Sequence, residues 1–273
     1  MRSAAVWTLA LALGLLGPAN ASVMWVVENN SDQVYKVDIT TLTATLVGPA
    51  TVGVGFGGLG FAADGTLYCW NTATHGLFIV NQATGAFTAV GPGGQAWGCD
   101  TFDINPMTNE AIAWSVDGDL YDVNLAAGTT SFRVATTPNS LGIASAFAPD
   151  GRLYNLDGRL EVDDLNWVDT TTGVVTKISD NPGVFASNLG YNPDDGMLYA
   201  IEVLDPSYPL YRLDPTSGAV TFVGNISGFP NDPNQQITMA TFERQPSELI
   251  PEPTTMALLS LAGLGILRRR RGR

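Results

Sequence analysis

The feature that most constrains the fold of this chain is a 15-residue segment that occurs five times at nearly constant spacing. In each copy an apolar or aromatic run leads to Asp or Asn, and a polar turn and a second alternating run follow. The copies read VYKVDITTLTATLVG, LFIVNQATGAFTAVG, LYDVNLAAGTTSFRV, LNWVDTTTGVVTKIS and LYRLDPTSGAVTFVG, beginning at Val34, Leu77, Leu120, Leu165 and Leu210. Their Asp or Asn residues, 43, 43, 45 and 45 positions apart, are Asp38, Asn81, Asn124, Asp169 and Asp214. A fixed period of this length indicates a repeat architecture.

Each copy has the composition of a β-hairpin. An Asp or Asn side chain at the end of a strand can accept hydrogen bonds from backbone amides two residues on, and Gly adopts positive φ without steric cost. We therefore interpret the five Asp and Asn residues as turn caps rather than as a ring of ligands.

A second hairpin pattern lies upstream of the later copies. It reads LGFAADGTLYCWN, TFDINPMTNEAIAWS, SAFAPDGRLYNLD and LGYNPDDGMLYAIE, beginning at Leu59, Thr101, Ser145 and Leu189. Asp-Gly between alternating apolar runs is a strong hairpin signal. Each period of roughly 44 residues thus predicts four short strands, which is one blade of a β-propeller.

The first copy lacks its opening strand. VMWVVENN, from Val23, aligns with the second strand of the unit, whereas ITMATFERQ, from Ile237, resembles the first strand and has no blade after it. We predict an all-β, five-bladed β-propeller in which this C-terminal strand joins the N-terminal blade and leaves no open edge. Residues 23–245 resemble secreted β-propeller families with a Leu-Tyr–x–Val/Leu–Asp/Asn–x–x–Thr-Gly core, and this likeness implies an architecture but no particular activity.

The N-terminus has the pattern of a secretory signal peptide. Arg2 provides the positive charge, Ala4 to Leu16 form an apolar run, and small residues precede a predicted signal peptidase cleavage between Ala21 and Ser22. The apolar run is shorter than the roughly 20 residues that a membrane-spanning helix needs. The sequence therefore predicts an exported protein.

The charge of the chain is divided unevenly. Residues 22–250 contain 25 acidic and seven basic residues, whereas five of the remaining arginines lie within the last six positions. A surface so acidic repels nucleic acid and anionic membranes, so we exclude both as partners of the body. Acidity of this kind more often keeps a protein soluble than forms a binding site.

Candidate catalytic groups are few. The charged residues of the predicted innermost strands include Asp103 and Glu243. A glycosidase would need two carboxylates roughly 5–9 Å apart, and these two residues are the candidate pair. The alternative is that both carboxylates bind backbone amides at strand ends. His75 is the only histidine, which we interpret as an exposed turn residue, and no G-x-S-x-G segment is present, so a Ser–His–Asp enzyme is disfavoured.

Two further kinds of site remain open. Cys69 and Cys99 either form one disulfide, as an oxidising compartment permits, or remain two buried thiols. The sequence predicts no cofactor, with Ca²⁺ as the one candidate exception because carboxylates gather in predicted turns. The candidate ligands, none with EF-hand spacing, are Asp117, Asp119, Asp194 and Asp195. The glycine-rich run from Gly53 to Gly60 has no following helix, so it predicts no nucleotide site.

The strand pattern stops at Gln245, and a proline-containing linker leads to 12 apolar or small residues, Met256 to Leu267. As a helix these would extend about 18 Å, short of a bilayer core of roughly 30 Å. The residues that frame this segment are Pro251, Glu252 and Pro253 before it and Arg268, Arg269, Arg270 and Arg271 after it.

Those three ordered elements resemble the PEP-CTERM sorting signal of exported bacterial proteins. The resemblance implies transient anchoring in the inner membrane by the C-terminus, processing near Pro251-Glu252-Pro253 by an exosortase-type enzyme, and delivery to the cell surface or extracellular matrix. It identifies a destination rather than an activity.

The chain is thus expected to comprise a signal peptide (1–21), a β-propeller domain (22–245), a linker with the Pro-Glu-Pro motif (246–255) and a C-terminal sorting segment (256–273). We expect a non-enzymatic binding or structural module, with polysaccharide or another surface protein as its partner. The alternative is a secreted, glycosidase-like hydrolase that uses Asp103 and Glu243.

Overall fold

The computed structural model describes residues 22–29, 32–53, 55, 57–94, 98–159, 162–180, 182–203, 205–230 and 236–243. Within these ranges the chain forms twenty β-strands and no helix, so none of the described residues lies in a helix that could cross a bilayer. The predicted signal peptide up to Ala21, the linker and the sorting segment lie outside the described residues.

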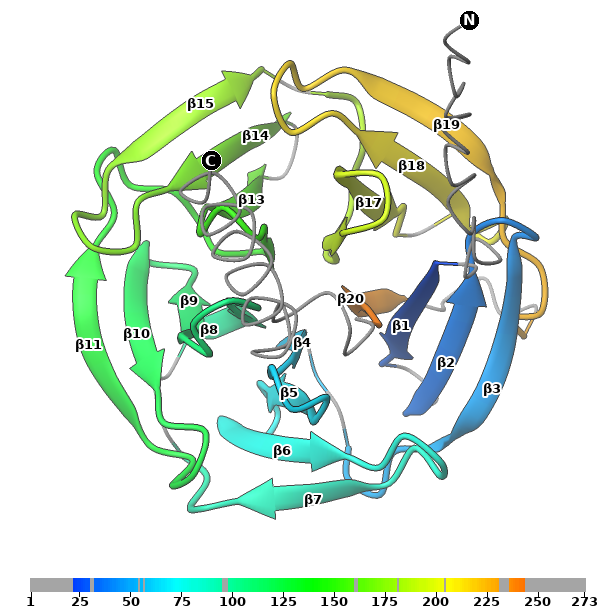
Figure 1. Ribbon diagram of the computed structural model, residues 1–273, viewed down its shortest axis with the longest axis horizontal. Coiled ribbons are helices and arrows are strands. Elements are labelled where there is room, and N and C mark those ends of the chain that lie inside the picture. The colour runs from blue at the N-terminus through cyan, green and yellow to red at the C-terminus, as the bar shows by residue number, and fades with distance from the viewer. Residues whose placement is uncertain are drawn as a thin grey trace, which may run out of the picture.

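The strands form five antiparallel four-stranded sheets, which are arranged as blades around a common axis (Figure 1). Blade one contains β20 (Ile237–Phe242), β1 (Val23–Glu28), β2 (Gln33–Asp38) and β3 (Thr43–Pro49). Blade two contains β4 (Gly57–Phe61), β5 (Leu67–Asn71), β6 (Gly76–Val80) and β7 (Phe87–Val90). Blade three contains β8 (Cys99–Ile104), β9 (Ala111–Ser115), β10 (Asp119–Val123) and β11 (Thr130–Ala135). Blade four contains β12 (Ala144–Phe147), β13 (Leu153–Arg159), β14 (Val162–Val168) and β15 (Val175–Ser179). Blade five contains β16 (Gly190–Asn192), β17 (Met197–Ile201), β18 (Pro209–Leu213) and β19 (Val220–Asn225). The predicted five-bladed propeller is confirmed.

The ring closes through blade one, whose inner strand comes from the far end of the described chain. β20 pairs antiparallel with β1, with Met24 opposite Phe242 and Val26 opposite Ala240. The backbone amide of Glu243 then donates to the carbonyl of Val23 at 2.8 Å. The predicted closure by a C-terminal strand is confirmed.

The inner strands β4, β8, β12, β16 and β20 contact one another in a ring around the axis (Figure 1). The glycine-rich segment supplies β4, and its glycines permit this close approach. A Cβ atom on Gly58 would lie 2.0 Å from the carbonyl oxygen of Phe102 on β8. The glycine run therefore serves strand packing between blades one, two and three.

Large apolar side chains fill the space between neighbouring blades. Trp25, Trp70 and Trp114 occupy the second strand of blades one, two and three, and all three are fully buried. Each packs into a core shared with the next blade, as Trp114 does with Phe147 and Leu153. The indole N–H of Trp114 donates to the carbonyl of Ser140 at 3.0 Å, so burial leaves no polar cost there. Burying one such side chain stabilises the fold by roughly 1.5–3 kcal/mol.

The five predicted turn caps are confirmed. In every blade one side-chain oxygen accepts hydrogen bonds from the backbone amides two and three residues later. The capping residues are Asp38, Asn81, Asn124, Asp169 and Asp214. Because each cap satisfies two turn amides with its own side chain, the five residues are occupied by local structure.

The capped turns also join neighbouring blades at the rim. Gly128 ends the turn of blade three with φ +67°, and a Cβ there would lie 1.6 Å from the carbonyl oxygen of Val90 at the end of β7. Where blade five meets blade one, the amide of Ala44 donates to the carbonyl of Ser227 at 2.7 Å. The first copy has Leu42 in place of the turn glycine, also at positive φ. Each turn thus rests against the outer strand of the preceding blade.

This contact predicts unequal effects of two glycine substitutions. Gly128→Ala adds both backbone strain and a collision with Val90, whereas Gly65→Ala adds strain alone, because no atom lies within 4 Å of a Cβ at Gly65 (φ +84°). Gly65→Ala should lower the free energy of unfolding by about 1–2 kcal/mol, and Gly128→Ala by more. Urea unfolding of both variants measures the difference, and equal losses would contradict the proposed turn contact.

The capping carboxylates predict an acid-sensitive component of stability. Hydrogen bonds from Thr172 and Thr171 hold the pKa of Asp169 below its usual value, and those from Thr216 and Ser217 do the same for Asp214. A depressed pKa stabilises the fold above the unfolded-state pKa, and this stabilisation is lost as pH falls through the folded-state pKa.

Asn replaces Asp at this position in blades two and three, so the double variant Asp169→Asn/Asp214→Asn should fold and should not titrate there. Its urea midpoint should match the wild type near pH 7 and should fall less below about pH 4. Midpoints measured across this range decide the matter: parallel curves for the two proteins would refute the assignment.

Candidate functional site

Asp103 lies on the inner strand β8 and is only 4% exposed. Its carboxylate accepts hydrogen bonds from the amide of Ile104 at 2.7 Å and from the amide of Phe147 on β12 at 2.6 Å. Asp103 therefore links blade three to blade four. The alternative that this carboxylate binds backbone amides at strand ends is confirmed.

Glu243 follows β20 and has different partners from those expected. Its carboxylate accepts a hydrogen bond from the indole N–H of Trp25 at 3.3 Å and forms an ion pair with Lys36 at 3.6 Å. The expectation of backbone-amide partners is wrong here, because the Glu243 side chain lies beside Trp25 of β1 and Lys36 of β2. β4 lies between β20 and β8 in the ring, so Glu243 and Asp103 come from strands that are not ring neighbours.

Of the two alternatives for the cysteines, the structure contains free thiols, and both are buried. Cys69 packs in the core between blades one and two, with its sulfur 3.4 Å from that of Met239. Cys99 belongs to the core between blades two and three. Burial raises the pKa of Cys99 to about 12 and raises that of Cys69 further. Neither thiol is therefore ionised for nucleophilic chemistry near neutral pH.

The expected turn position of His75 is confirmed, but its side chain is half-buried rather than exposed. His75 has φ +47° in the turn before β6. Burial raises the pKa of Asp100 on the neighbouring β8, and the charge of His75 opposes that rise. A carboxylate of the next blade thus lies within electrostatic reach of His75.

The calcium candidates are dispersed among local contacts. Asp195 accepts hydrogen bonds from the amide of Met197 and the hydroxyl of Tyr199, and Asp194 accepts one from the hydroxyl of Ser22. Asp117 is exposed in the turn before Asp119. Across the described ranges, no three His, Cys, Asp or Glu side chains gather closely enough to hold a metal ion. Calcium binding stays a prediction without support from this geometry.

The described residues do contain a cleft of about 250 Å³, lined mainly by polar residues, on blade four beside its junction with blade three. It is formed by the connection that follows β11 and by strands β13, β14 and β15. The lining residues are Pro138, Asn139, Ser140, Asp157, Asp164, Asn166, Val175 and Lys177. We call this feature the blade-four cleft.

Buried polar groups lie at the inner side of the blade-four cleft: Ser140 and Asp157 line it, and Asn155 lies behind them. Asp157, 8% exposed, accepts hydrogen bonds from the hydroxyl of Ser140 at 3.2 Å and the amide of Leu141 at 3.3 Å. Asn155 is fully buried and donates to the carbonyl of Leu141 at 2.8 Å and to the Ser140 hydroxyl at 3.3 Å. Its Oδ1 has no hydrogen-bond partner among the described atoms. An unpaired buried acceptor costs about 1–3 kcal/mol.

The outer side of the cleft is charged. The ammonium of Lys177 lies 2.7 Å from Asp164 and 2.7 Å from Asp180. Hydrogen bonds to Asp164 and Asp180 raise the pKa of Lys177, so it remains cationic. Asn166 lies beside this pair and is 4% exposed. Ser140, Asn166 and Lys177 were not predicted from the sequence as site residues. The available signal was in the fourth repeat copy. Its second residue is Asn166, whereas the other four copies have Tyr or Phe at that position.

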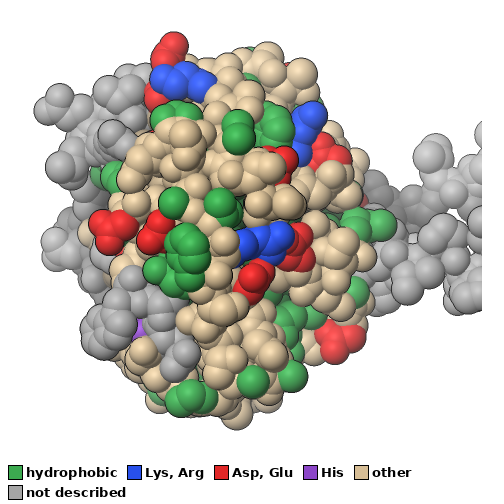
Figure 2. Space-filling view, turned by 90° about the vertical axis from the view of Figure 1, so that its left-hand side faces the viewer, with side chains coloured by type: hydrophobic (Ala, Val, Ile, Leu, Met, Phe, Trp, Pro, Cys, Tyr) green, Lys and Arg blue, Asp and Glu red, His purple; other side chains and the backbone are tan. Residues whose placement is uncertain are grey.

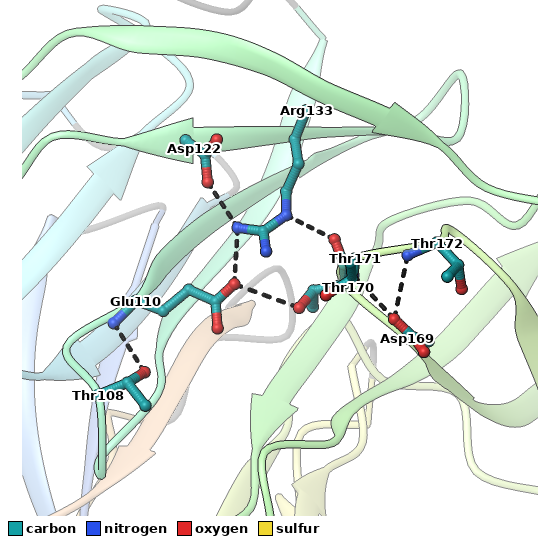
Figure 3. A network of polar contacts seen from close by, with 8 residues as sticks. All are labelled: Thr108, Glu110, Asp122, Arg133, Asp169, Thr170, Thr171 and Thr172. Atoms are coloured by element: carbon teal, nitrogen blue, oxygen red, sulfur yellow. Dashed lines mark hydrogen bonds and ion pairs between the residues drawn. The ribbon is translucent and has the colours of Figure 1, made fainter.

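A second polar cluster joins blades three and four at the rim (Figure 3). One guanidinium nitrogen of Arg133 lies 2.6 Å from both Asp122 and Glu110, and its Nε donates to the carbonyl of Thr170 in the next blade. The Thr170 hydroxyl donates to Glu110 at 3.2 Å. The Arg133 cluster is therefore a tie between blades.

On the side shown in Figure 2, basic side chains are sparse and lie beside acidic ones, and hydrophobic groups are scattered.

Comparison with known proteins identifies the C-terminal segment. Residues 249–271 match the PEP-CTERM protein-sorting motif. The chain carries a PEP-CTERM sorting signal. The predicted resemblance is confirmed, and the motif implies an exported protein that is transiently anchored by its C-terminus and processed by exosortase-type machinery. No curated protein matches the chain.

Solved structures match the propeller. They include a chain of the "Crystal structure of Nidogen/Laminin Complex", with 10% sequence identity, a TM-score of 0.55, and coverage of 82% of this chain and 98% of that chain. At this identity the likeness shows the fold alone.

The contacts of Asp103 predict a structural role for this carboxylate. Asp103→Ala leaves the buried amides of Ile104 and Phe147 without their acceptor and should lower the free energy of unfolding by about 2–4 kcal/mol. Asp117→Ala, at an exposed turn position, should change it by less than about 0.5 kcal/mol. Urea unfolding measures both values, and a loss at Asp103 no larger than that at Asp117 would contradict the link between blades.

Proposed function

We propose that this protein is a non-enzymatic, surface-delivered β-propeller that acts as a binding or structural module at the cell surface or in the extracellular matrix. The observation that carries the proposal is the sorting motif at residues 249–271 on the same chain as a closed five-bladed ring. Polysaccharide or another surface protein would be its partner.

The contacts of the candidate catalytic groups support a binding role. Asp103 has two backbone amide partners, and Glu243 is paired with Trp25 and Lys36, so each carboxylate has a structural task. The blade-four cleft offers hydrogen-bonding groups on a framework that is braced by its neighbours. A module of this kind recognises a partner without rearranging, because its groups are already ordered.

Delivery is tested through the tail. Alanines at Pro251, Glu252 and Pro253 should leave an unprocessed, membrane-retained protein, because the enzyme that recognises the motif can no longer act. The matched control replaces Gln245, Pro246 and Ser247, which precede the motif, and should be processed normally. Membrane fractionation and mass spectrometry of the released protein read out both variants.

The wild-type surface protein should lack Arg273 in the same mass spectra. Recovery of Arg273 on that protein, or equal processing of the motif variant and its control, would overturn the delivery proposal.

A further inference from the structure

Four of the five blades share one apolar cross-strand row of side chains, and blade four departs from it. In blades one, two, three and five the residues that lie opposite one another on the three outer strands are Val26–Tyr35–Leu46, Cys69–Phe78–Ala89, Ala113–Tyr121–Phe132 and Ala200–Tyr211–Phe222. In blade four the same row is Asn155–Asn166–Lys177. An apolar row with an aromatic centre has thus become entirely polar.

The departure continues onto the inner strand. Ser145 lies opposite Asn155, whereas the corresponding inner-strand residues of blades one, two and three are Ala240, Leu59 and Phe102. Four polar residues therefore cross blade four from the axis to the rim, on the face that meets blade three, where the Ser145 hydroxyl lies 2.7 Å from that of Thr101.

This substitution accounts for the blade-four cleft. In blades three and five the central aromatic ring packs against an outer-strand phenylalanine, with centroids 6.0 Å apart for Tyr121–Phe132 and 5.8 Å apart for Tyr211–Phe222. The corresponding residues of blade four, Asn166 and Lys177, both line the cleft. The smaller asparagine leaves unfilled the space that a ring occupies in the other blades.

The polar row costs stability, which indicates a use for it. Asn155 and Asn166 are at most 4% exposed, and the Asn155 Oδ1 has no partner among the described atoms. Burying polar groups that are imperfectly paired is unfavourable, and the apolar row of the other four blades shows what the fold accepts without that cost. A local departure that costs stability is typical of a functional site.

We propose that the blade-four cleft binds a neutral, polyhydroxylated unit of the size of one sugar ring. An anionic ligand would meet Asp157 and Asp164, and a cationic ligand would have to displace Lys177 from between Asp164 and Asp180. A hydroxyl group both donates and accepts, so it can satisfy carboxylate, amide and ammonium groups together.

Size and shape agree with this ligand class. A cleft of about 250 Å³ holds roughly eight water molecules, which suits one sugar ring and excludes a folded peptide. Pro138 and Val175 offer apolar surface for the C–H groups of such a ring. This inference rests on the proposed binding role and gives it a site and a ligand class.

The test uses the repeat's own consensus to fill the cleft. The full chain, in a detergent without sugar groups, is titrated with glucose, galactose, mannose and N-acetylglucosamine, and with the charged analogues glucuronate and glucosamine, by ligand-observed NMR. At least one neutral sugar should bind the wild type more tightly than either charged analogue. The variant Asn166→Tyr/Lys177→Phe should weaken that binding at least about tenfold and should melt no lower than the wild type.

Two further variants keep the experiment decisive if the double variant folds poorly. Asn166→Leu nearly preserves side-chain volume while removing the amide, and it should also lose binding. Phe222→Lys changes the equivalent rim position of blade five and should bind as the wild type does.

The proposal is overturned if no neutral sugar binds the wild type, if a charged analogue binds more tightly, or if filling the cleft leaves affinity unchanged. Loss of the ligand proposal with normal tail processing would leave the delivery proposal standing, because the two readouts are independent.

Discussion

The antiparallel pairing of β20 with β1 is the interaction on which the rest of the structure depends. It joins residues more than 200 positions apart, with Met24 opposite Phe242, and it supplies the inner strand without which blade one would be incomplete. The same strand contacts β4 and β16, so its loss would open the inner ring on both sides. Closing so long a loop carries an entropic cost that grows only slowly with length, and buried Met24, Met239 and Phe242 help to offset it.

The parts of the fold that could be predicted from the sequence are those set by local chemistry or by the repeat. The turns were predictable because their chemistry is local: each cap bonds amides two and three residues away. The strand count and the split blade were predictable from the repeat, because the first copy lacks a strand that reappears after the last copy. The purpose of the glycine run was not predictable, because Gly58 is required by Phe102, a residue on another blade. Asp103 likewise finds one partner, Phe147, only when β8 and β12 meet.

The residues of the blade-four cleft were only partly predictable from the sequence. Asn166 and Lys177 are visible in the fourth repeat copy, yet they become neighbours only through a register shift between Leu165 and Asn166. Comparable shifts occur in blades one, three and five. Sequence alignment of the copies shows that two positions differ, and only the strand register shows that both belong to one row with Asn155.

Polarity alone does not distinguish this row. Two residues beyond its second-strand member, every blade has a polar residue: Glu28, Asn71, Ser115, Asp157 and Glu202. In blades one, two and four these side chains bond the backbone of the incoming connection, as Asp157 does with Leu141. Asp157 is therefore a repeated structural feature that the cleft happens to expose. Asn155 occupies a position that is apolar in the other four blades, and a departure within a repeat is stronger evidence of function than a polar residue that recurs.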